Sequence, residues 1–223
     1  MLKDFISLIF PQNCINCQQS LISAEDYLCT PCKIDLPRTN DHKLESNDLH
    51  RKFVFEPKIK SATAFMYFHK GGIAQKLLHQ LKYKGKKDLG ILLGYWFAPN
   101  LSEMGTDVDF IIPVPLHKSK KRKRGFNQSE CIAEGLSETL EKPVELNLVT
   151  RLVATQSQTR KSKVQRWRNL ENVYSKVDRD LTGMSILIVD DVITTGATVG
   201  MLCDRLIEAN AAAIHIACIA RGK

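Results

Sequence analysis

The chain has 223 residues, 43% apolar and 25% charged, a composition typical of globular proteins and too apolar for a disordered chain. No apolar run approaches the roughly 18 residues of a membrane-spanning helix, and the first ten residues lack the features of a secretory signal. We therefore expect no membrane span and a cytoplasmic location. The net charge is +8, and its distribution along the chain is more informative than its size.

The positive charge is concentrated in three stretches without acidic residues, at 82–87, 118–124 and 151–168. They carry four, six and six lysines and arginines, so the rest of the chain has a net charge of −8. Such clustering favours an anionic partner. Three solvated surfaces are the alternative.

The N-terminal segment places Leu2, Phe5, Ile6 and Ile9 at helical spacing. The apolar stripe fits packing on the protein's own domain, which we prefer, or docking onto a partner or membrane.

Four cysteines follow in two Cys-x-x-Cys pairs, separated by eleven residues: Cys14, Cys17, Cys29 and Cys32. Two such pairs supply the four thiolates of a tetrahedral structural zinc site with no open position. Disulfides and a redox pair are the alternatives, but the three other cysteines occur unpaired in apolar contexts. The intervening loop is short for a zinc ribbon, and Gln18 stands where glycine would ease the turn.

The chain then divides by composition. We expect an N-terminal helix and zinc ribbon over 1–40, a polar linker over 41–60 and the main domain over 61–223. Apolar periodicity predicts helices over 72–83 and 89–98.

From residue 108 the pattern alternates between strand and helix. It predicts a strand over 109–114, a basic loop to Asn127, and a helix capped by Asn127 with Glu130. The alternating pattern continues with a buried strand over 186–189, a helix from Thr198 and a strand over 213–219. These elements predict an α/β fold with a parallel sheet, flanking helices and a ligand at the carboxyl ends of the strands.

The segment VDDVITTGAT, at 189–198, indicates what that ligand is. Asp190 and Asp191 suit hydrogen-bond donation from ribose hydroxyls, or Mg²⁺ held through water. The next residues form a phosphate-binding loop at a helix N-terminus: Thr194, Thr195, Gly196, Ala197 and Thr198. A ribose 5-phosphate satisfies both halves, and no P-loop or dinucleotide glycine motif is present.

VDDVITTGAT is similar to the signature of type I phosphoribosyltransferases, which bind phosphoribosyl pyrophosphate (PRPP). With the paired Cys-x-x-Cys start, HKGGIAQKLLHQLKYKGKKDLG, PVPLHKSKKRKRGFNQS and TQSQTRKSKVQRWRNLENVY, nearly the whole chain resembles the ComF (ComFC) family. That resemblance implies a zinc ribbon, a phosphoribosyltransferase fold and a role in natural transformation after DNA enters the cytoplasm. Many members carry further ribbon cysteines. Residues 33–130 here contain none, so we expect one zinc.

The resemblance also assigns roles by position. Asp190 and Asp191 would hold the ribose, residues 194–198 the 5-phosphate, and segment 155–168 a lid. The loop after Val114 would contact the pyrophosphate of PRPP with its Mg²⁺, through Leu116, His117, Lys118 and Arg124. His117 is a candidate proton carrier, although polar surface is the commoner role of a loop histidine.

Two function classes remain open, because no segment identifies an acceptor. One is a phosphoribosyltransferase with an unknown acceptor. The other is a single-stranded nucleic-acid-binding competence factor with a regulatory PRPP site and a protein partner in DNA uptake. Trp167 would stack on a base or pack within the protein. The nucleic-acid candidates are Lys120, Lys121, Arg122, Lys123, Arg160, Lys161, Lys163, Arg166, Trp167 and Arg168.

Overall fold

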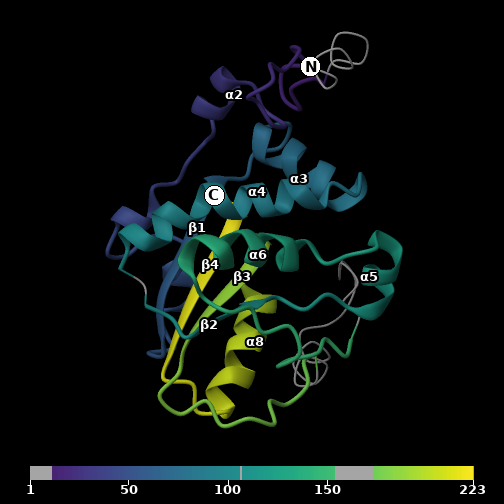
Figure 1. The fold of residues 1–223 in the computed structure, drawn as a ribbon. Coiled ribbons are helices and arrows are strands. Elements are labelled where there is room, and N and C mark those ends of the chain that lie inside the picture. Colours follow the sequence, from purple (N-terminus) through teal and green to yellow (C-terminus); the bar gives the residue numbers. More distant parts are fainter. Residues whose placement is uncertain (1–11, 106, 154–172, 223) are drawn as a thin grey trace.

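A computed structural model describes residues 12–105, 107–153 and 173–222 of the chain. A central sheet lies between helices on both faces, and the N-terminal cysteine-rich region sits above one helical layer (Figure 1). In chain order the elements are α2 (Thr30–Ile34), η1 (Asp41–Lys43), η2 (His50–Phe53), β1 (Ile59–Tyr67), α3 (Ile73–Tyr83), α4 (Lys87–Glu103), β2 (Phe110–Pro113), α5 (Lys118–Arg124), α6 (Gln128–Leu140), β3 (Ser185–Ile193), α8 (Ala197–Glu208) and β4 (Ala213–Arg221).

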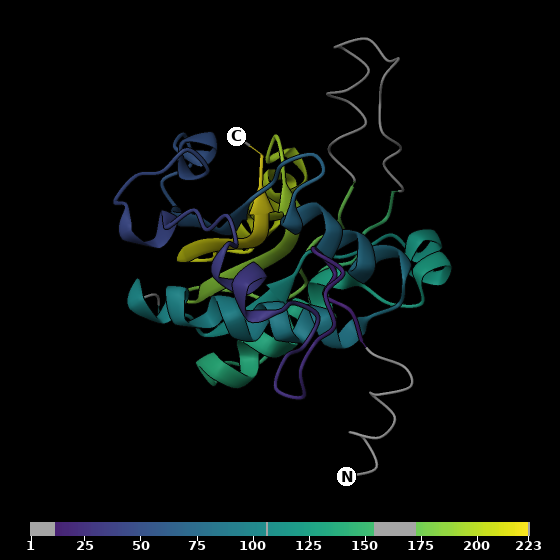
Figure 2. The same cartoon turned by 90° about the horizontal axis from the view of Figure 1, so that it is seen from above.

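The sheet has the strand order β1-β4-β3-β2, and every pairing within it is parallel. Strand β3 pairs with β2 on one side and β4 on the other, so it is covered along both edges. Strands β1 and β2 form the outer edges, and η1 and η2 pack beside β1. Helix α5 is the short teal helix at the right of Figure 2. The predicted parallel α/β fold is confirmed.

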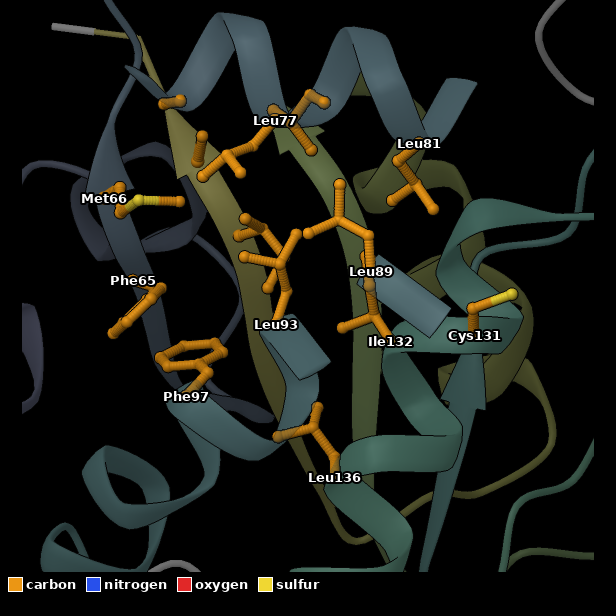
Figure 3. Packing of buried hydrophobic residues seen from close by; sticks show 14 of the residues in the cluster. Phe65, Met66, Leu77, Leu81, Leu89, Leu93, Phe97, Cys131, Ile132 and Leu136 are labelled. Carbon is orange, nitrogen blue, oxygen red and sulfur yellow. The ribbon is translucent and has the colours of Figure 1, made fainter. Parts of the chain in front are cut away.

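Alternate residues of the strands enter two separate cores, as the two-residue period of a strand requires. Leu187 and Val189 pack with α3, α4 and α6 on one face of the sheet, whereas Ile186 and Ile188 pack with α8 on the other. Figure 3 shows the first core, where Leu77 and Leu81 of α3 meet Leu89 of α4. Burial on both faces explains why β3 is a continuous apolar run.

Helices α4 and α6 pack with their backbones in direct contact. A Cβ atom built at Gly94 would lie 2.4 Å from the carbonyl oxygen of Ile132, and one at Gly135 would lie 2.0 Å from that of Ile91. Neither position has room for a methyl group. The two glycines therefore set the separation between these helices.

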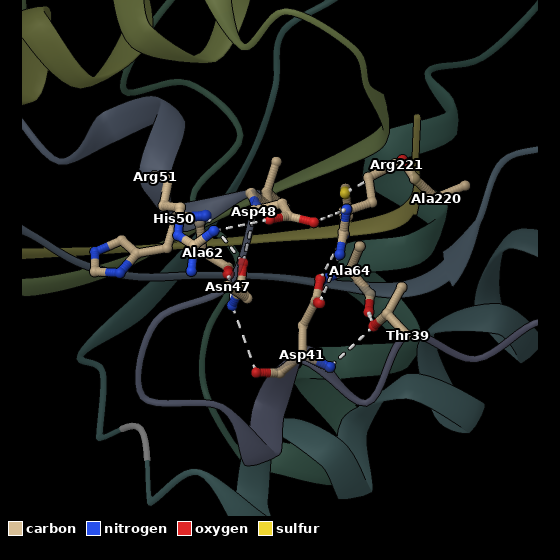
Figure 4. A network of polar contacts seen from close by, with 12 residues as sticks. Thr39, Asp41, Asn47, Asp48, His50, Arg51, Ala62, Ala64, Ala220 and Arg221 are labelled. Carbon is tan, nitrogen blue, oxygen red and sulfur yellow. Dashed lines mark hydrogen bonds and ion pairs between the residues drawn. The ribbon is translucent and has the colours of Figure 1, made fainter. Parts of the chain in front are cut away.

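The segment before β1 is held by buried polar contacts (Figure 4). The Arg221 guanidinium at the end of β4 donates to both carboxylate oxygens of Asp41, at 2.8 and 3.0 Å. The side chain of Asn47 donates to the carbonyl oxygen of Ala62 at 2.8 Å and accepts from the N–H of His50, the first residue of η2, at 2.9 Å. These contacts attach residues 41–50 to β1 and β4.

Several local expectations are corrected by the structure. The stretch predicted as a basic loop before Asn127 contains the helix α5. Strand β1 was not predicted, and it begins within the expected linker. Helix α4 continues past the expected end at residue 98, through Pro99, to Glu103, and α8 begins one residue before Thr198. Strand β3 continues through Asp190 and Asp191 instead of ending before them.

Two further expectations concern the ends of the chain and its domains. The predicted helix over Leu2–Ile9 lies outside the described residues. The division at 41–60 stays a prediction, although Leu49 and Phe53 within that segment are buried. In the part of the chain that the structure describes, no helix combines the length and apolar character needed to cross a bilayer.

Candidate ribose-phosphate site and cysteine cluster

The acidic pair, Asp190 and Asp191, lies in the second half of β3. The Asp190 carboxylate accepts hydrogen bonds from the Ser129 hydroxyl at 3.1 Å and from the N–H of Asp191 at 2.8 Å. Asp191 forms an ion pair with Lys82 of α3, with 2.7 Å between Oδ2 and Nζ. Helices α3 and α6 thus each contribute one polar contact to this pair.

The two carboxylates have different environments. Burial raises the pKa of Asp190 to about 7, and the neighbouring charge of Asp191 adds to the increase. Lys82 and the two hydrogen bonds to Asp190 act in the opposite direction without cancelling it. The site therefore contains an ionisable group that titrates near neutral pH.

The threonine loop, residues 194–198, connects the acidic pair to α8. Gly196 is the N-cap of α8 and has a φ of +83°, and it supplies no side-chain cap. A Cβ there would also lie 2.9 Å from the Phe53 ring. The carbonyl oxygen of Thr194 accepts from Lys52. In the first turn of α8 the N–H of Ala197 donates to the Thr195 hydroxyl at 3.4 Å. The N–H groups of Thr198 and Val199, which point the same way, remain available to an anion above the loop.

A basic cluster gathers near the acidic pair from three parts of the chain: Lys82, Lys120, Arg124 and Arg151. Desolvation and the positive charges of Arg151, Arg124 and Lys82 lower the pKa of Lys120, so the four cations act on one another. Mutual repulsion of this kind is relieved when a polyanion binds among the cations.

The predicted pyrophosphate loop leads into α5. His117 is the N-cap of that helix, and its Nδ1 accepts from the N–H of Ser119 at 3.2 Å. Leu116 is half-buried and Lys118 is exposed. Arg124 donates to the side-chain oxygen of Gln128 at 2.6 Å and lies over the Tyr83 ring. Asn127 caps α6 as predicted, but the Glu130 carboxylate binds Lys121 instead of completing a capping box.

Two buried polar atoms near the acidic pair have no hydrogen-bond partner. They are Nε2 of Gln128, next to Ser129 on α6, and the hydroxyl of Tyr174, whose pKa is raised by burial and also by the charge of Asp190. Both side chains are 2% exposed. An unpartnered buried donor is unfavourable unless a ligand or water completes it.

The cysteine cluster, Cys14, Cys17, Cys29 and Cys32, forms the second site. All four sulfur atoms lie within 4.8 Å of one another, and three of the four residues are buried. The sulfurs of Cys17 and Cys29 are 3.6 Å apart, close to the roughly 3.8 Å between two ligands of a tetrahedral zinc with Zn–S bonds of about 2.3 Å. All seven cysteines are free thiols, which disfavours the disulfide alternative.

The chemistry of the donors also fits a metal. Burial alone would raise the pKa of the Cys14 thiol, but N–H groups of Cys17, Cys29 and Asn16 outweigh it and lower that pKa to about 6. In the same cluster the pKa of Cys29 and Cys32 is raised, because burial and contacts with the Cys17 and Cys14 thiols outweigh the hydrogen bonds that lower it, so one thiolate forms readily and these two would lose their protons to a bound metal. Gln18 adopts a φ of +66°, the left-handed turn that favours glycine. The residues present therefore fit a structural zinc.

We expect the wild-type protein to carry about one zinc, and Cys14→Ser to carry none and to lose order in residues 12–36. The sheet should persist, because its strands lie outside the cluster. Metal analysis and far-UV circular dichroism measure the two effects. Cys203→Ala, which removes a buried thiol from α8, should retain the full zinc content. A metal-free wild type would contradict the prediction.

Several sequence-predicted residues are not placed by the described structure. The lid 155–168, with Arg160, Lys161, Lys163, Arg166, Trp167 and Arg168, lies outside the described residues. Lys121, Arg122 and Lys123 lie exposed on α5. Sequence reasoning did not single out Lys52, Ser129 or Tyr174, and it used Lys82 and Arg151 only as contributors to charge. Lys82 and Arg151 carried a usable signal, since each lies in an acid-free basic stretch.

The fold and the site together indicate the class of protein domain. Residues 122–223, which include α6, β3, the acidic pair and the threonine loop, match the family model described as "Phosphoribosyl transferase domain". The chain therefore contains a type I phosphoribosyltransferase-like domain preceded by a four-cysteine cluster.

Comparison with known proteins shows two similar relatives. The "DNA utilization protein YhgH" of Escherichia coli is 34% identical over 151 residues, which cover 65% of this chain and 66% of that protein. The "Competence protein ComFC" of Bacillus subtilis is 24% identical over 202 residues, covering 90% of this chain and 80% of that protein. The chain is thus a homologue of the ComF proteins, ComFC and YhgH among them.

Among solved structures, the glutamine PRPP amidotransferase of Bacillus subtilis superposes with a TM-score of 0.43. It is 20% identical, and the match covers 63% of this chain and 30% of that chain.

Proposed function

We propose that the protein binds PRPP with Mg²⁺ at the acidic pair and the threonine loop, and that it acts in DNA uptake in the cytoplasm. The observation that carries the proposal is the juxtaposition of three groups at one end of β3. The acidic pair suits a ribose diol, the N-terminus of α8 suits a 5-phosphate, and the basic cluster suits a pyrophosphate. The names of the two relatives, a competence protein and a DNA utilization protein, support the cellular role.

The same residues support glycosyl transfer to an unidentified acceptor. In that reaction the bond between C1 and the pyrophosphate oxygen breaks, and its electron pair leaves with the pyrophosphate. The acceptor forms the new bond to C1 and releases a proton. Arg124 and Lys120 would neutralise the leaving charge, and Ser129 would keep Asp190 oriented toward the ribose. Mg²⁺, when bound with the pyrophosphate, would supply further neutralisation as a Lewis acid.

Calorimetric titration with PRPP and MgCl₂ tests the binding. We expect one equivalent of PRPP to bind, and ribose 5-phosphate to bind more weakly because it lacks the pyrophosphate. A pyrophosphate-release screen over nucleobases and amines then distinguishes an enzyme from a regulatory site. Absence of PRPP binding would contradict the proposal.

A second candidate function is binding of single-stranded nucleic acid through α5. This seven-residue helix has six lysines and arginines and no buried side chain. Such a surface provides cations beyond those that face the acidic pair. Under this alternative the PRPP site regulates DNA binding instead of catalysing transfer, and a partner in DNA uptake receives the strand.

Binding through the α5 surface predicts a defined salt dependence. For a single strand, the logarithm of the binding constant falls with that of salt by about 0.7 for each cation engaged. Replacing Arg122 and Lys123 by Ala should flatten that slope by about 1.4. Fluorescence anisotropy of a labelled oligonucleotide over a salt series measures it.

The control for that experiment removes two positive charges elsewhere. Lys43→Ala with Lys142→Ala, which disrupts two surface ion pairs, should leave the slope unchanged. A dissociation constant above roughly 10⁻⁴ M at physiological salt would be that of non-specific binding and would contradict the nucleic-acid role.

A further inference from the structure

Helix α3 contacts the cysteine cluster near its start. The ammonium of Lys76 donates to the backbone oxygen of Asn16 at 3.0 Å and to its side-chain oxygen at 2.9 Å. Asn16 lies between Cys14 and Cys17, and its side-chain amide donates to the sulfur of Cys32 at 3.3 Å. Lys76 therefore binds the turn that presents two cysteines and touches a third.

The same helix contacts the acidic pair at its other end. Lys82 lies six residues after Lys76, roughly 9 Å further along the helix axis, and pairs with Asp191. Between them, Leu77, Leu78 and Leu81 are buried against the core, so the helix is a packed element with little freedom to bend. Figure 1 shows α3 between the cysteine-rich region and the sheet.

We infer that Lys76 and Lys82 are positioning residues of the ribose-phosphate site. Lys82 holds the Asp191 carboxylate where a ribose would meet it, and Lys76 fixes that helix to the cysteine cluster. Zinc at the cysteines then strengthens ligand binding at the acidic pair. The inference rests on the proposed function and extends it, because it makes the metal a regulator of ligand affinity.

Two adjacent carboxylates repel a phosphorylated ligand, and Lys82 offsets one of those charges from a partly buried position, with 22% of its side chain exposed. Zinc fixes the turn that contains Asn16, because Cys14 and Cys17 on both sides of it become ligands. Without zinc the two acceptors of Lys76 lose their fixed place, and the start of α3 loses one restraint.

Coupling between two binding sites is reciprocal, and coupled sites typically change each other's affinity by about 5-fold to 150-fold. We therefore expect saturating PRPP and MgCl₂ to raise the zinc affinity of the wild-type protein at least about fivefold. Equilibrium competition with a zinc-selective chromophoric chelator measures this on the full chain and requires no metal-free preparation.

Variants distinguish a loss of coupling through Lys76 from a general loss of stability. Lys76→Met should keep zinc and bind PRPP, but the effect of PRPP on zinc affinity should disappear. Lys82→Met should weaken PRPP binding by calorimetry, and Lys82→Arg should restore most of it. The matched control is Lys33→Met. Lys33 of α2 lies 4.6 Å from the Trp96 ring centroid of α4, another contact of the cysteine-rich region, and its loss should leave the coupling intact.

The outcomes are distinguishable. PRPP binding to the zinc-loaded wild type with an unchanged zinc affinity would overturn the inference and leave the proposed function standing. Coupling that persists in Lys76→Met, or disappears equally in Lys33→Met, would also overturn it. Absence of PRPP binding to the zinc-loaded wild type would overturn both.

Discussion

Replacing Arg221 by Met should lower the free energy of unfolding by about 3–5 kcal/mol, because it leaves a buried carboxylate without its partner. The Asp41 side chain is 0% exposed and that of Arg221 is 4% exposed. For a chain of this length the loss corresponds to a fall of roughly 6–20 °C in melting temperature. Thermal unfolding followed by circular dichroism measures it.

Two further variants test whether the loss of stability comes from the buried ion pair between Asp41 and Arg221. Arg51→Met removes an exposed ion pair with Asp48 and should change stability by less than about 1 kcal/mol. Asp41→Leu combined with Arg221→Met removes both charges and should recover part of the stability lost in the single variant. An Arg221→Met protein as stable as Arg51→Met would show that residues 41–50 are not held by this ion pair.

The double variant Asp190→Asn with Asp191→Asn should weaken PRPP binding by at least about a hundredfold. Two hydrogen bonds to charged acceptors at roughly 1.5–3 kcal/mol each account for that loss. The fold should persist, since both side chains face the site. Calorimetric titration measures the affinity, and Asp178→Asn, at an exposed position, is the control. Unchanged affinity in the double variant would refute the ribose assignment.

Asp190 also makes stability depend on pH in a defined direction. Its folded pKa of about 7 lies above the unfolded value of about 3.9, so the folded state binds its proton more tightly. The wild type therefore loses stability as pH rises from about 4 to about 7, by an amount on the order of 4 kcal/mol.

Asp190→Asn alone should remove that loss. Its stability relative to wild type should be clearly higher at pH 8 than at pH 4, as measured by chemical denaturation at both values. A difference independent of pH would contradict the raised pKa of Asp190.

The sequence predicts the centre of this fold better than its edges. Strand β3 and α8 were predicted because an apolar run, two carboxylates and a glycine at a helix start each carry a local signal. Strand β1 was missed because its small and polar residues, such as Ser61 and Thr63, resemble a loop. Helix α5 was missed because KSKKRKR has no apolar periodicity and is capped by His117, an unusual capping residue.

The site residues also differ in how well the sequence predicts them. The acidic pair, the threonine loop and the four cysteines are contiguous or regularly spaced motifs, so sequence reasoning could single them out. The contacts that position them join distant parts of the chain, as in the ion pair between Lys82 and Asp191 and the hydrogen bond from Ser129 to Asp190. No local pattern contains such contacts, because they follow from how α3 and α6 pack on the sheet.

The glycine contact between α4 and α6 limits how this site can vary. Ser129 belongs to the first turn of α6, so its reach to Asp190 depends on where the whole helix rests against β3. A single added methyl at Gly94 or Gly135 would force the two helices apart, since both positions already touch backbone. Substitutions at these glycines, which form no polar contact with the acidic pair, would therefore move Ser129 relative to Asp190 by changing the spacing of two tightly packed helices.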